Sequence, residues 1–265
     1  MSSTTRLQAA LSDLKEGVCS IYIWPVLGWQ EVKQRYRRST LGPFWLTLST
    51  GAMIGAMGPL YGRLLGQDVA SYFLYLATSF IIWLFISGLV TESCQAFISA
   101  EGYIKQSKLP LTVHVLRVIW KNLIFFAHNM VIVVIVMLAY PPPALSLVWL
   151  FPVGIALIMV NGLWCGLLLG LLCARFRDIP QIVTSLMQVA MFLTPIFWKA
   201  DMLGKHQWAA TWNPIFHFLE VARAPLLGVA AGAQSWLVVF AVTILGSLVT
   251  LVFFTRFRAR IAYWV

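Results

Sequence analysis

Charged residues are scarce in this sequence, and their scarcity excludes an ordinary soluble domain. Asp, Glu, Lys and Arg make up only 11% of the 265 residues, whereas soluble domains carry about a quarter. Hydrophobic residues account for 60%, including 12 Trp and 17 Phe. This composition is typical of an integral membrane protein. The length fits one compact helical unit and leaves no room for an additional nucleotide-binding domain.

Several chemical motifs are also missing. The sequence has no GxxxxGK[ST] loop, which cradles nucleotide phosphates, so any energy from ATP must come from a partner. The four cysteines lack CxxC spacing, and we expect them to pack rather than to bind metal or form disulfides. The nine acidic residues are scattered, which disfavours paired-carboxylate catalysis. We therefore expect no catalytic residue, no metal site and no bound cofactor in this chain.

Six apolar segments are candidates for membrane spans, each of which needs roughly 20 mostly apolar residues. The prolines at 141–143 divide the longest uncharged stretch, because proline cannot continue a helix. The predicted spans cover residues 43–61, 72–91, 122–139, 147–173, 179–198 and 235–255. The expected fold is all-α and membrane-integral, with both termini on one side.

The whole chain, residues 1–265, is expected to form one transmembrane domain. Residues 1–40 would hold the cytoplasmic N-terminus and an amphipathic interface helix, and the six spans would lie within 43–255. The 199–230 segment, between spans five and six, is too polar to span and too apolar for an ordinary loop. We expect short re-entrant helices there, or alternatively a folded external loop. Residues 256–265 would form a cytoplasmic tail.

The basic residues orient this scheme. Fifteen of the nineteen Lys and Arg residues fall in segments on the same side as the termini. The positive-inside rule places that side in the cytoplasm. The net charge of +10 comes from residues that flank apolar runs and form no continuous basic face, so we expect no binding of nucleic acid.

The segment 25–38 is amphipathic. As a helix it gathers four apolar residues within an arc of about 60°: Pro25, Trp29, Val32 and Tyr36. Such a helix lies in the plane of the membrane among the lipid headgroups. Three arginines point elsewhere and are candidates to bind a lipid headgroup or pyrophosphate, because guanidinium groups grip phosphate bidentately: Arg35, Arg37 and Arg38. The alternative is that they only anchor and orient the chain.

Four stretches in order resemble the permeases of ABC-2 type polysaccharide and O-antigen exporters. They read RYRRSTLGPFW (35–45), ARFRDIPQ (174–181), TPIFW (194–198) and WNPIFHFLEVARAPLLG (212–228). The resemblance implies a homodimer in a bacterial inner membrane, joined to two copies of an ATPase subunit that binds ATP and Mg. It also implies export of a lipid-linked polysaccharide, such as O-antigen on undecaprenyl pyrophosphate. Capsule and teichoic-acid exporters share this frame.

The ATPase contact is expected on the inner segment 99–110, which is short and of mixed charge. Its candidate residues are Glu101, Gly102, Tyr103, Ile104 and Lys105, of which Tyr103 and Ile104 would form an exposed apolar pair. Arg177 and Asp178 of the RDI sequence are a second candidate contact. A plain surface turn, and pairing of Arg175 or Arg177 with Asp178, are the structural alternatives.

Two further groups are candidates for the polymer path. Sugar rings stack on aromatic rings, which suggests a channel lined by Phe44, Trp45, Tyr61, Phe192, Phe197 and Trp198, although aromatics also anchor helices at interfaces. A gate on the outer side is expected at Asn213, Pro214, His217, Glu220 and Arg223, where helical spacing would let Glu220 meet His217 or Arg223. Glu92, at the inner end of span two, has either a functional role or a structural one. A membrane-embedded transferase and a non-catalytic assembly subunit are the competing functions.

Overall fold

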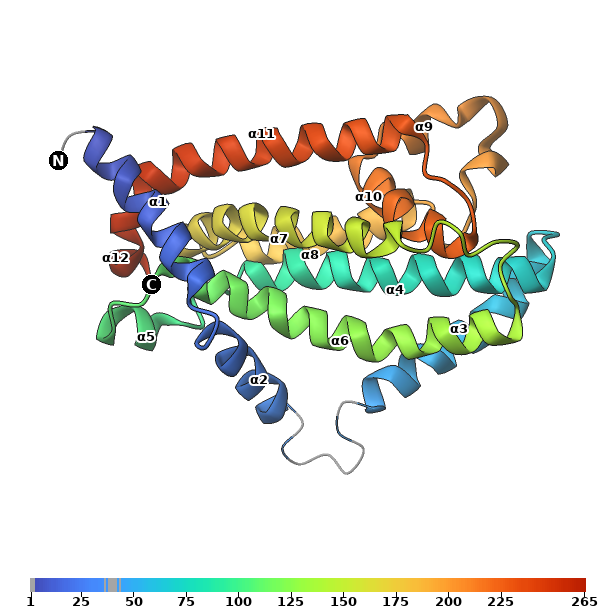
Figure 1. The fold of residues 1–265 in the computed structure, drawn as a ribbon, viewed down its shortest axis with the longest axis horizontal. Helices are drawn as coiled ribbons and strands as arrows, with labels where there is room; N and C mark the ends of the chain where they lie inside the picture. The colour runs from blue at the N-terminus through green and yellow to red at the C-terminus, as the bar shows by residue number, and fades with distance from the viewer. Residues whose placement is uncertain (1–2, 36, 38–41, 43) are drawn as a thin grey trace.

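The structure, a computed structural model, describes residues 3–35, 37, 42 and 44–265, and every regular element within them is a helix. Long helices run side by side along the molecule, and both termini lie at the same end (Figure 1). We call this the terminal end, and the opposite one the far end. Helices α1 (Ser3–Cys19), α2 (Trp24–Arg35), α5 (Glu101–Gln106) and α12 (Ile261–Trp264) gather at the terminal end (Figure 1).

Four helices are long and apolar enough to cross a membrane. They are α4 (Val69–Ser93), α6 (Leu111–Ala139), α7 (Leu150–Arg175) and α11, which begins at Ala233 and leads into the C-terminal helical turns. Helix α3 (Phe44–Leu64) has 21 residues, and α8 (Ile179–Leu193) is a shorter apolar helix of 15 residues. The prediction of an all-helical membrane protein is confirmed, while the six crossings stay a prediction.

The predicted span limits agree with the helices except at α6 and α8. Helix α6 begins at Leu111 rather than near residue 122, so Arg117 and Lys121 belong to the helix and not to a loop before it. Helix α8 stops at Leu193, and the TPIFW sequence that follows is not helical. The backbone extends at Thr194, whose side chain donates to the oxygen of Ala190.

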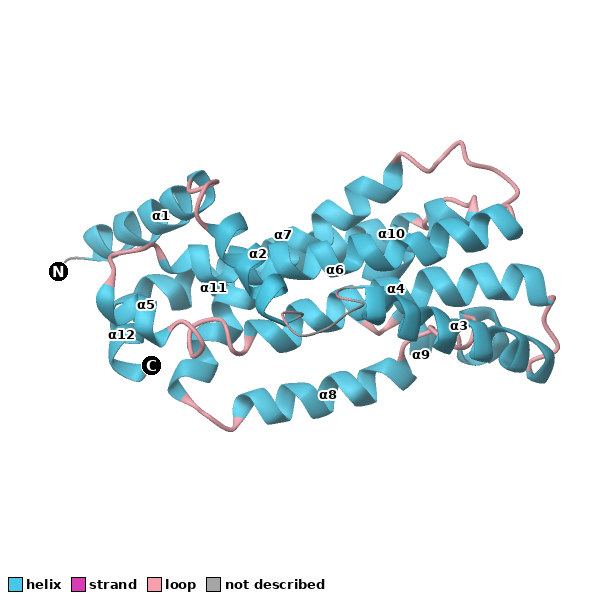
Figure 2. Ribbon diagram, turned by 90° about the horizontal axis from the view of Figure 1, so that it is seen from below, coloured by secondary structure: helices cyan, strands magenta, loops and turns pink. Residues whose placement is uncertain are grey.

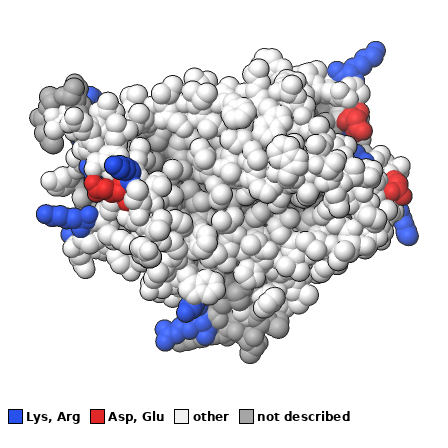
Figure 3. All heavy atoms as spheres, viewed as in Figure 1, with Lys and Arg blue, Asp and Glu red and all other residues white. Residues whose placement is uncertain are grey.

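Helix α4 forms the centre of the bundle. It packs against α3, α6, α7, α8 and α10 (Pro214–Arg223), and 67% of its most apolar window is buried, against 17% for α11. Helix α8 lies along one edge of the bundle (Figure 2). The charged side chains visible in Figure 3 lie at the two ends and at one corner, with an uncharged belt between them. Such a belt is the surface that a bilayer solvates.

Local sequence explains where α4 begins. Asp68 accepts a hydrogen bond from the backbone N–H of Ser71 at 2.9 Å, which supplies a partner for an otherwise unpaired donor in the first turn. The same bond lowers the pKa of Asp68, because it stabilises the charged carboxylate.

The N-terminal helices differ from the prediction. Helix α1 was not anticipated, and it packs across α6 and α11. Helix α2 packs on α6 through Gly28 and Val32, whereas Trp29 of the predicted apolar stripe is 46% exposed. The stripe was wrong because Gly28 lets α2 approach so closely that a Cβ there would lie 3.0 Å from the backbone oxygen of Arg117.

Between α8 and α11 the chain forms a series of short helices. They are η1 (Ala200–His206), α9 (Trp208–Thr211), α10, and η2 (Ala224–Leu227). Helix α10 is the one that reaches the bundle, where it packs on α4, α7 and α11. The prediction of short helices in this segment is confirmed, and their depth in a membrane stays a prediction.

Candidate functional site

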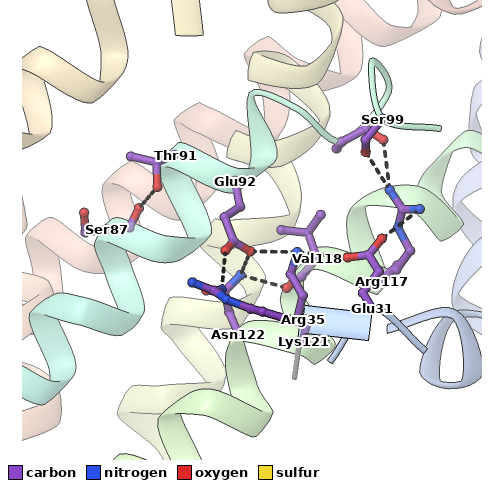
Figure 4. Close-up of polar contacts among 11 residues, drawn as sticks. Glu31, Arg35, Ser87, Thr91, Glu92, Ser99, Arg117, Val118, Lys121 and Asn122 are labelled. Atoms are coloured by element: carbon purple, nitrogen blue, oxygen red, sulfur yellow. Dashed lines mark hydrogen bonds and ion pairs between the residues drawn. The ribbon is translucent and has the colours of Figure 1, made fainter. Parts of the chain in front are cut away.

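A network of ion pairs joins α2, α4 and α6 towards the terminal end of the bundle (Figure 4). Its central residue is Lys121 of α6, whose Nζ lies 2.9 Å from Glu31 Oε2 and 3.0 Å from Glu92 Oε2. Lys121 therefore bridges a carboxylate of α2 and a carboxylate of α4. The Nδ2 of Asn122 also donates to Glu92, at 2.8 Å.

Arg117, one helical turn before Lys121, connects the network to a loop. Its side chain is 96% buried, and its Nη1 lies 3.0 Å from Glu31 Oε1. Its Nη2 donates to Ser99 Oγ at 3.0 Å and to the oxygen of Ala96 at 3.4 Å. Ser99 and Ala96 lie in the segment between α4 and α5. One guanidinium group thus holds α2 and the approach to α5 together, as Figure 4 shows.

Arg35 closes the network at its exposed edge. Its Nη1 lies 3.7 Å from Glu92 Oε1, its guanidinium sits 5.1 Å from the centroid of Phe125, and about half of its side chain is exposed. Beside it is a cavity of about 160 Å³ that is also lined by Asn129. The three cations of the network outnumber its two carboxylates. Its chemistry therefore favours an anion at Arg35.

Of the three arginines predicted to bind a headgroup, Arg35 belongs to this network and Arg37 follows the end of α2 with its side chain exposed. Arg38 lies outside the described residues. Glu92 has structural partners, which favours the structural alternative proposed for it.

Sequence reasoning missed the pairing of Glu31, Arg117 and Lys121. Arg117 and Lys121 had counted only as orienting charges. Their spacing of four residues, and the same spacing between Glu31 and Arg35, was the available signal.

The predicted ATPase contact forms the short helix α5. Lys105 Nζ lies 2.6 Å from Glu101 Oε1, and this hydrogen bond and the lysine charge lower the pKa of Glu101. Gly102 has open space around it, and Tyr103 is 48% exposed. The expected apolar pair was wrong in one member, because Ile104 is partly buried against the core.

The RDI sequence lies at the same end, but its expected ion pair is absent. Among the described residues, Asp178 forms no ion pair with Arg175 or Arg177. Both arginines instead contact Trp264 of α12. Arg177 Nη2 donates to its backbone oxygen at 3.2 Å, and the guanidinium of Arg175 lies 5.6 Å from its ring. Helix α12 also packs against α5 and α7, which brings both predicted contacts together.

The predicted channel aromatics form two groups rather than one. Tyr61 and Phe192 each stack near Phe197, with ring centroids 6.3 Å and 6.4 Å away. Trp198 joins them by donating from Nε1 to the oxygen of Phe192 at 3.2 Å. Phe44 and Trp45 lie at the other end of α3 and are exposed.

The predicted gate residues tie the short helices to the bundle. Arg223 is almost wholly buried, and it donates from Nη1 to Tyr75, Ser79 and the oxygen of Pro195 at 2.6–2.9 Å. Its Nε and Nη2 both donate to Glu220 Oε2, at 3.0 Å and 2.8 Å. Of the two partners considered for Glu220, the structure thus selects Arg223.

The other gate residues have separate roles. His217 contacts Ser235 Oγ at 3.0 Å through Nδ1 and the oxygen of Thr211 at 2.8 Å through Nε2. Asn213 accepts from the N–H of Ile215 at 3.0 Å and so caps α10, which has Pro214 in its first turn. Its Nδ2 donates to Thr194 Oγ1 at 2.8 Å. The site therefore offers no histidine and carboxylate pair free for acid–base chemistry, which argues against a transferase.

Apolar spanning helices, an uncharged belt and polar networks at the ends define a multi-pass membrane protein of the transport type. The sequence profile of the family described as ABC-2 type transporter matches residues 24–227. The chain belongs to this family.

Three proteins described as O-antigen export system permease protein RfbA are similar to it. One from Klebsiella pneumoniae is 27% identical over 192 residues, which cover 70% of this chain and 73% of the relative. A second from Klebsiella pneumoniae is 22% identical over 235 residues, covering 88% and 91%. One from Myxococcus xanthus is 24% identical over 174 residues, covering 66% and 67%.

Proposed function

We propose that this chain is the permease subunit of an ATP-driven exporter that moves a lipid-linked polysaccharide, of the O-antigen class, across the bacterial inner membrane. Membership of the ABC-2 family and the names of the three relatives support this function. The missing phosphate-binding loop means that a separate ATPase subunit must bind ATP and Mg. Capsule or teichoic-acid export by the same frame is the alternative, which chemical analysis of the polymer distinguishes.

The proposed topology has six crossings. To the four long apolar helices it adds α3, which at 1.5 Å per residue is about 31 Å long, and α8 with the residues that follow it. The terminal end faces the cytoplasm, because most basic residues belong to elements of that end. In this arrangement α10 and its neighbours dip into the outer leaflet and act as the gate, and a homodimer joined to two ATPase subunits encloses a path along α3 and α8.

The observation that carries the mechanism is the link through Arg117. Helix α5 would seat in the ATPase, so that nucleotide-driven motion displaces the segment containing Ser99. Because Arg117 binds Ser99 on one side and Glu31 on the other, that displacement would reach α2. Arg35 and Arg37 at the end of α2 would hold the pyrophosphate headgroup. Energy use and headgroup movement would thus be coupled through one buried side chain.

The coupling step is tested with Arg117→Lys. The lysine keeps the charge but lacks the planar fork that reaches two partners at once. In membranes with the ATPase, we expect assembly to persist while the amount of polymer exported per ATP hydrolysed falls. Arg6→Lys, at an exposed position of α1, is the matched control and should leave this ratio unchanged. An unchanged ratio in Arg117→Lys would reject the link.

The headgroup step is tested with the triple change of Arg35, Arg37 and Arg38 to Gln. Surface polysaccharide should be lost while the ATPase still co-purifies with the chain. Lys33→Gln removes one positive charge from the same helix at an exposed position and is the control for charge loss. Normal surface polysaccharide in the triple variant would exclude these arginines from headgroup binding.

A further inference from the structure

The largest cavity of the described chain lies at the far end, away from the ion-pair network. Its volume is about 790 Å³, within the range of roughly 300–1,000 Å³ of small-molecule sites. Its walls come from the start of α4, the prolines after α6, η1 and α10. Four separate elements therefore enclose a space that the proposed export mechanism does not use.

The cations of this cavity are already committed to the protein. All three nitrogens of the Arg223 guanidinium donate to protein oxygens, and Lys199 Nζ donates to Gln67 Oε1 at 2.9 Å. Facing them are three carboxylates, those of Asp68, Asp201 and Glu220. The lining thus carries one excess negative charge and no uncommitted cation among its described residues. An anionic ligand is disfavoured on both counts.

The carboxylates, in contrast, have acceptor capacity to spare. Both bonds from Arg223 end on Oε2 of Glu220, and Asp201 accepts no hydrogen bond within the described part of the chain. Two aromatic rings complete the lining, Tyr140 with part of its surface exposed and Phe216 with little. Carboxylate oxygens bind neighbouring hydroxyl groups, and an exposed ring offers a flat apolar face. A sugar presents hydroxyl groups at its edge and an apolar face on its ring.

We propose that this cavity binds a short, uncharged stretch of saccharide, with Asp201 accepting hydroxyl hydrogen bonds and Tyr140 stacking on a ring. The cavity lies beside the gate, since Glu220 and Arg223 belong to both. A segment held there would be one that has already passed the membrane. The binding site would keep the emerging polymer from sliding back between strokes. This inference rests on the proposed export of a sugar polymer.

The test is saturation-transfer NMR on the full-length protein in nanodiscs, in lipids without sugar headgroups. The probes are mannotriose and galactotriose as uncharged saccharides and trigalacturonate as the charged one. We expect transfer to at least one uncharged probe and none to trigalacturonate. Asp201→Asn and Tyr140→Ala should each weaken the apparent affinity about tenfold, as expected for one hydrogen bond to a charged group or one stacking contact.

Lys205→Gln is the matched control, because Lys205 is exposed on η1 and does not line the cavity. It should bind like the unmodified protein. No transfer to either uncharged probe, or equal transfer in all variants, would overturn the saccharide site. Failure of the proposed function gives a different result: deletion of the chain in cells would leave surface polysaccharide unchanged.

Discussion

The buried carboxylate of Asp13 provides a sharp test of how the terminal end is held together. It accepts hydrogen bonds from the N–H groups of Leu111 and Thr112, each at 3.0 Å, and from the Thr112 hydroxyl at 2.8 Å. It also pairs with Arg258 Nε at 2.8 Å. One side chain of α1 therefore caps α6 and fixes the C-terminal segment.

Replacing Asp13 with Ala removes all four contacts. The lost cap costs about 1–2 kcal/mol. The broken pair with Arg258 would cost about 3–5 kcal/mol if both charges were buried. Arg258 is one-third exposed and can regain water, so we reduce that part to about half. The expected loss is about 3–4 kcal/mol, which corresponds to a Tm decrease of about 6–12 °C for a chain of this size.

Thermal unfolding of the purified protein in detergent, followed by tryptophan fluorescence, measures this decrease. Asp13→Asn keeps one acceptor oxygen and should fall between the unmodified protein and Asp13→Ala. Lys15→Ala changes an exposed residue of the same helix and should shift Tm little. The reasoning is refuted if Asp13→Ala and Lys15→Ala unfold at the same temperature, because α1 would then not cap α6.

Three further predictions follow from other contacts. Gly28→Leu places a side chain against a backbone oxygen of α6, so α2 should separate and its backbone amides should lose protection from hydrogen exchange, whereas Gly102→Ala, in open space, should not. Asn213→Ala removes the cap of α10 and the bond to Thr194, which should cost about 2 kcal/mol by thermal unfolding. Because the pKa of Glu101 is lowered, its pair with Lys105 stabilises α5 above the unfolded pKa and is lost as pH falls through the folded value. NMR titration of Glu101 should show the shift, and Lys105→Gln should abolish it.

The sequence predicted the fold well where composition alone decides it. Apolar length and the prolines at 141–143 located the helices, because a bilayer imposes both limits on every span. It predicted α2 as a helix but gave it the wrong face. A moment of hydrophobicity weighs Trp29 heavily and Gly28 hardly at all, although the glycine decides which side can approach α6.

The site was less predictable because it depends on pairing across helices. Glu31 and Lys121 are 90 residues apart, and no local pattern shows that they meet. Asp178 illustrates the opposite error. An acid next to two arginines suggested a local pair, yet Arg175 and Arg177 contact Trp264, which lies far along the chain. Neighbours in sequence therefore predicted partners poorly at the terminal end.

The two buried arginines suggest why the chain tolerates charge inside the bundle. Burying a charge is costly unless it is paired, and apolar packing is often as stable as a buried ion pair. Arg117 and Arg223 nevertheless sit at opposite ends of the bundle, and each binds three or more partners from different elements. Each joins a short peripheral helix to the central helices, α2 in one case and α10 in the other. An apolar side chain could fill the same space but could not hold several polar atoms in register. We therefore expect Arg117→Met and Arg223→Met to retain the helical fold, measured by circular dichroism, while surface polysaccharide is lost. If export persisted in both variants, the arginines would be packing residues, and their position beneath the moving elements would have no mechanical meaning.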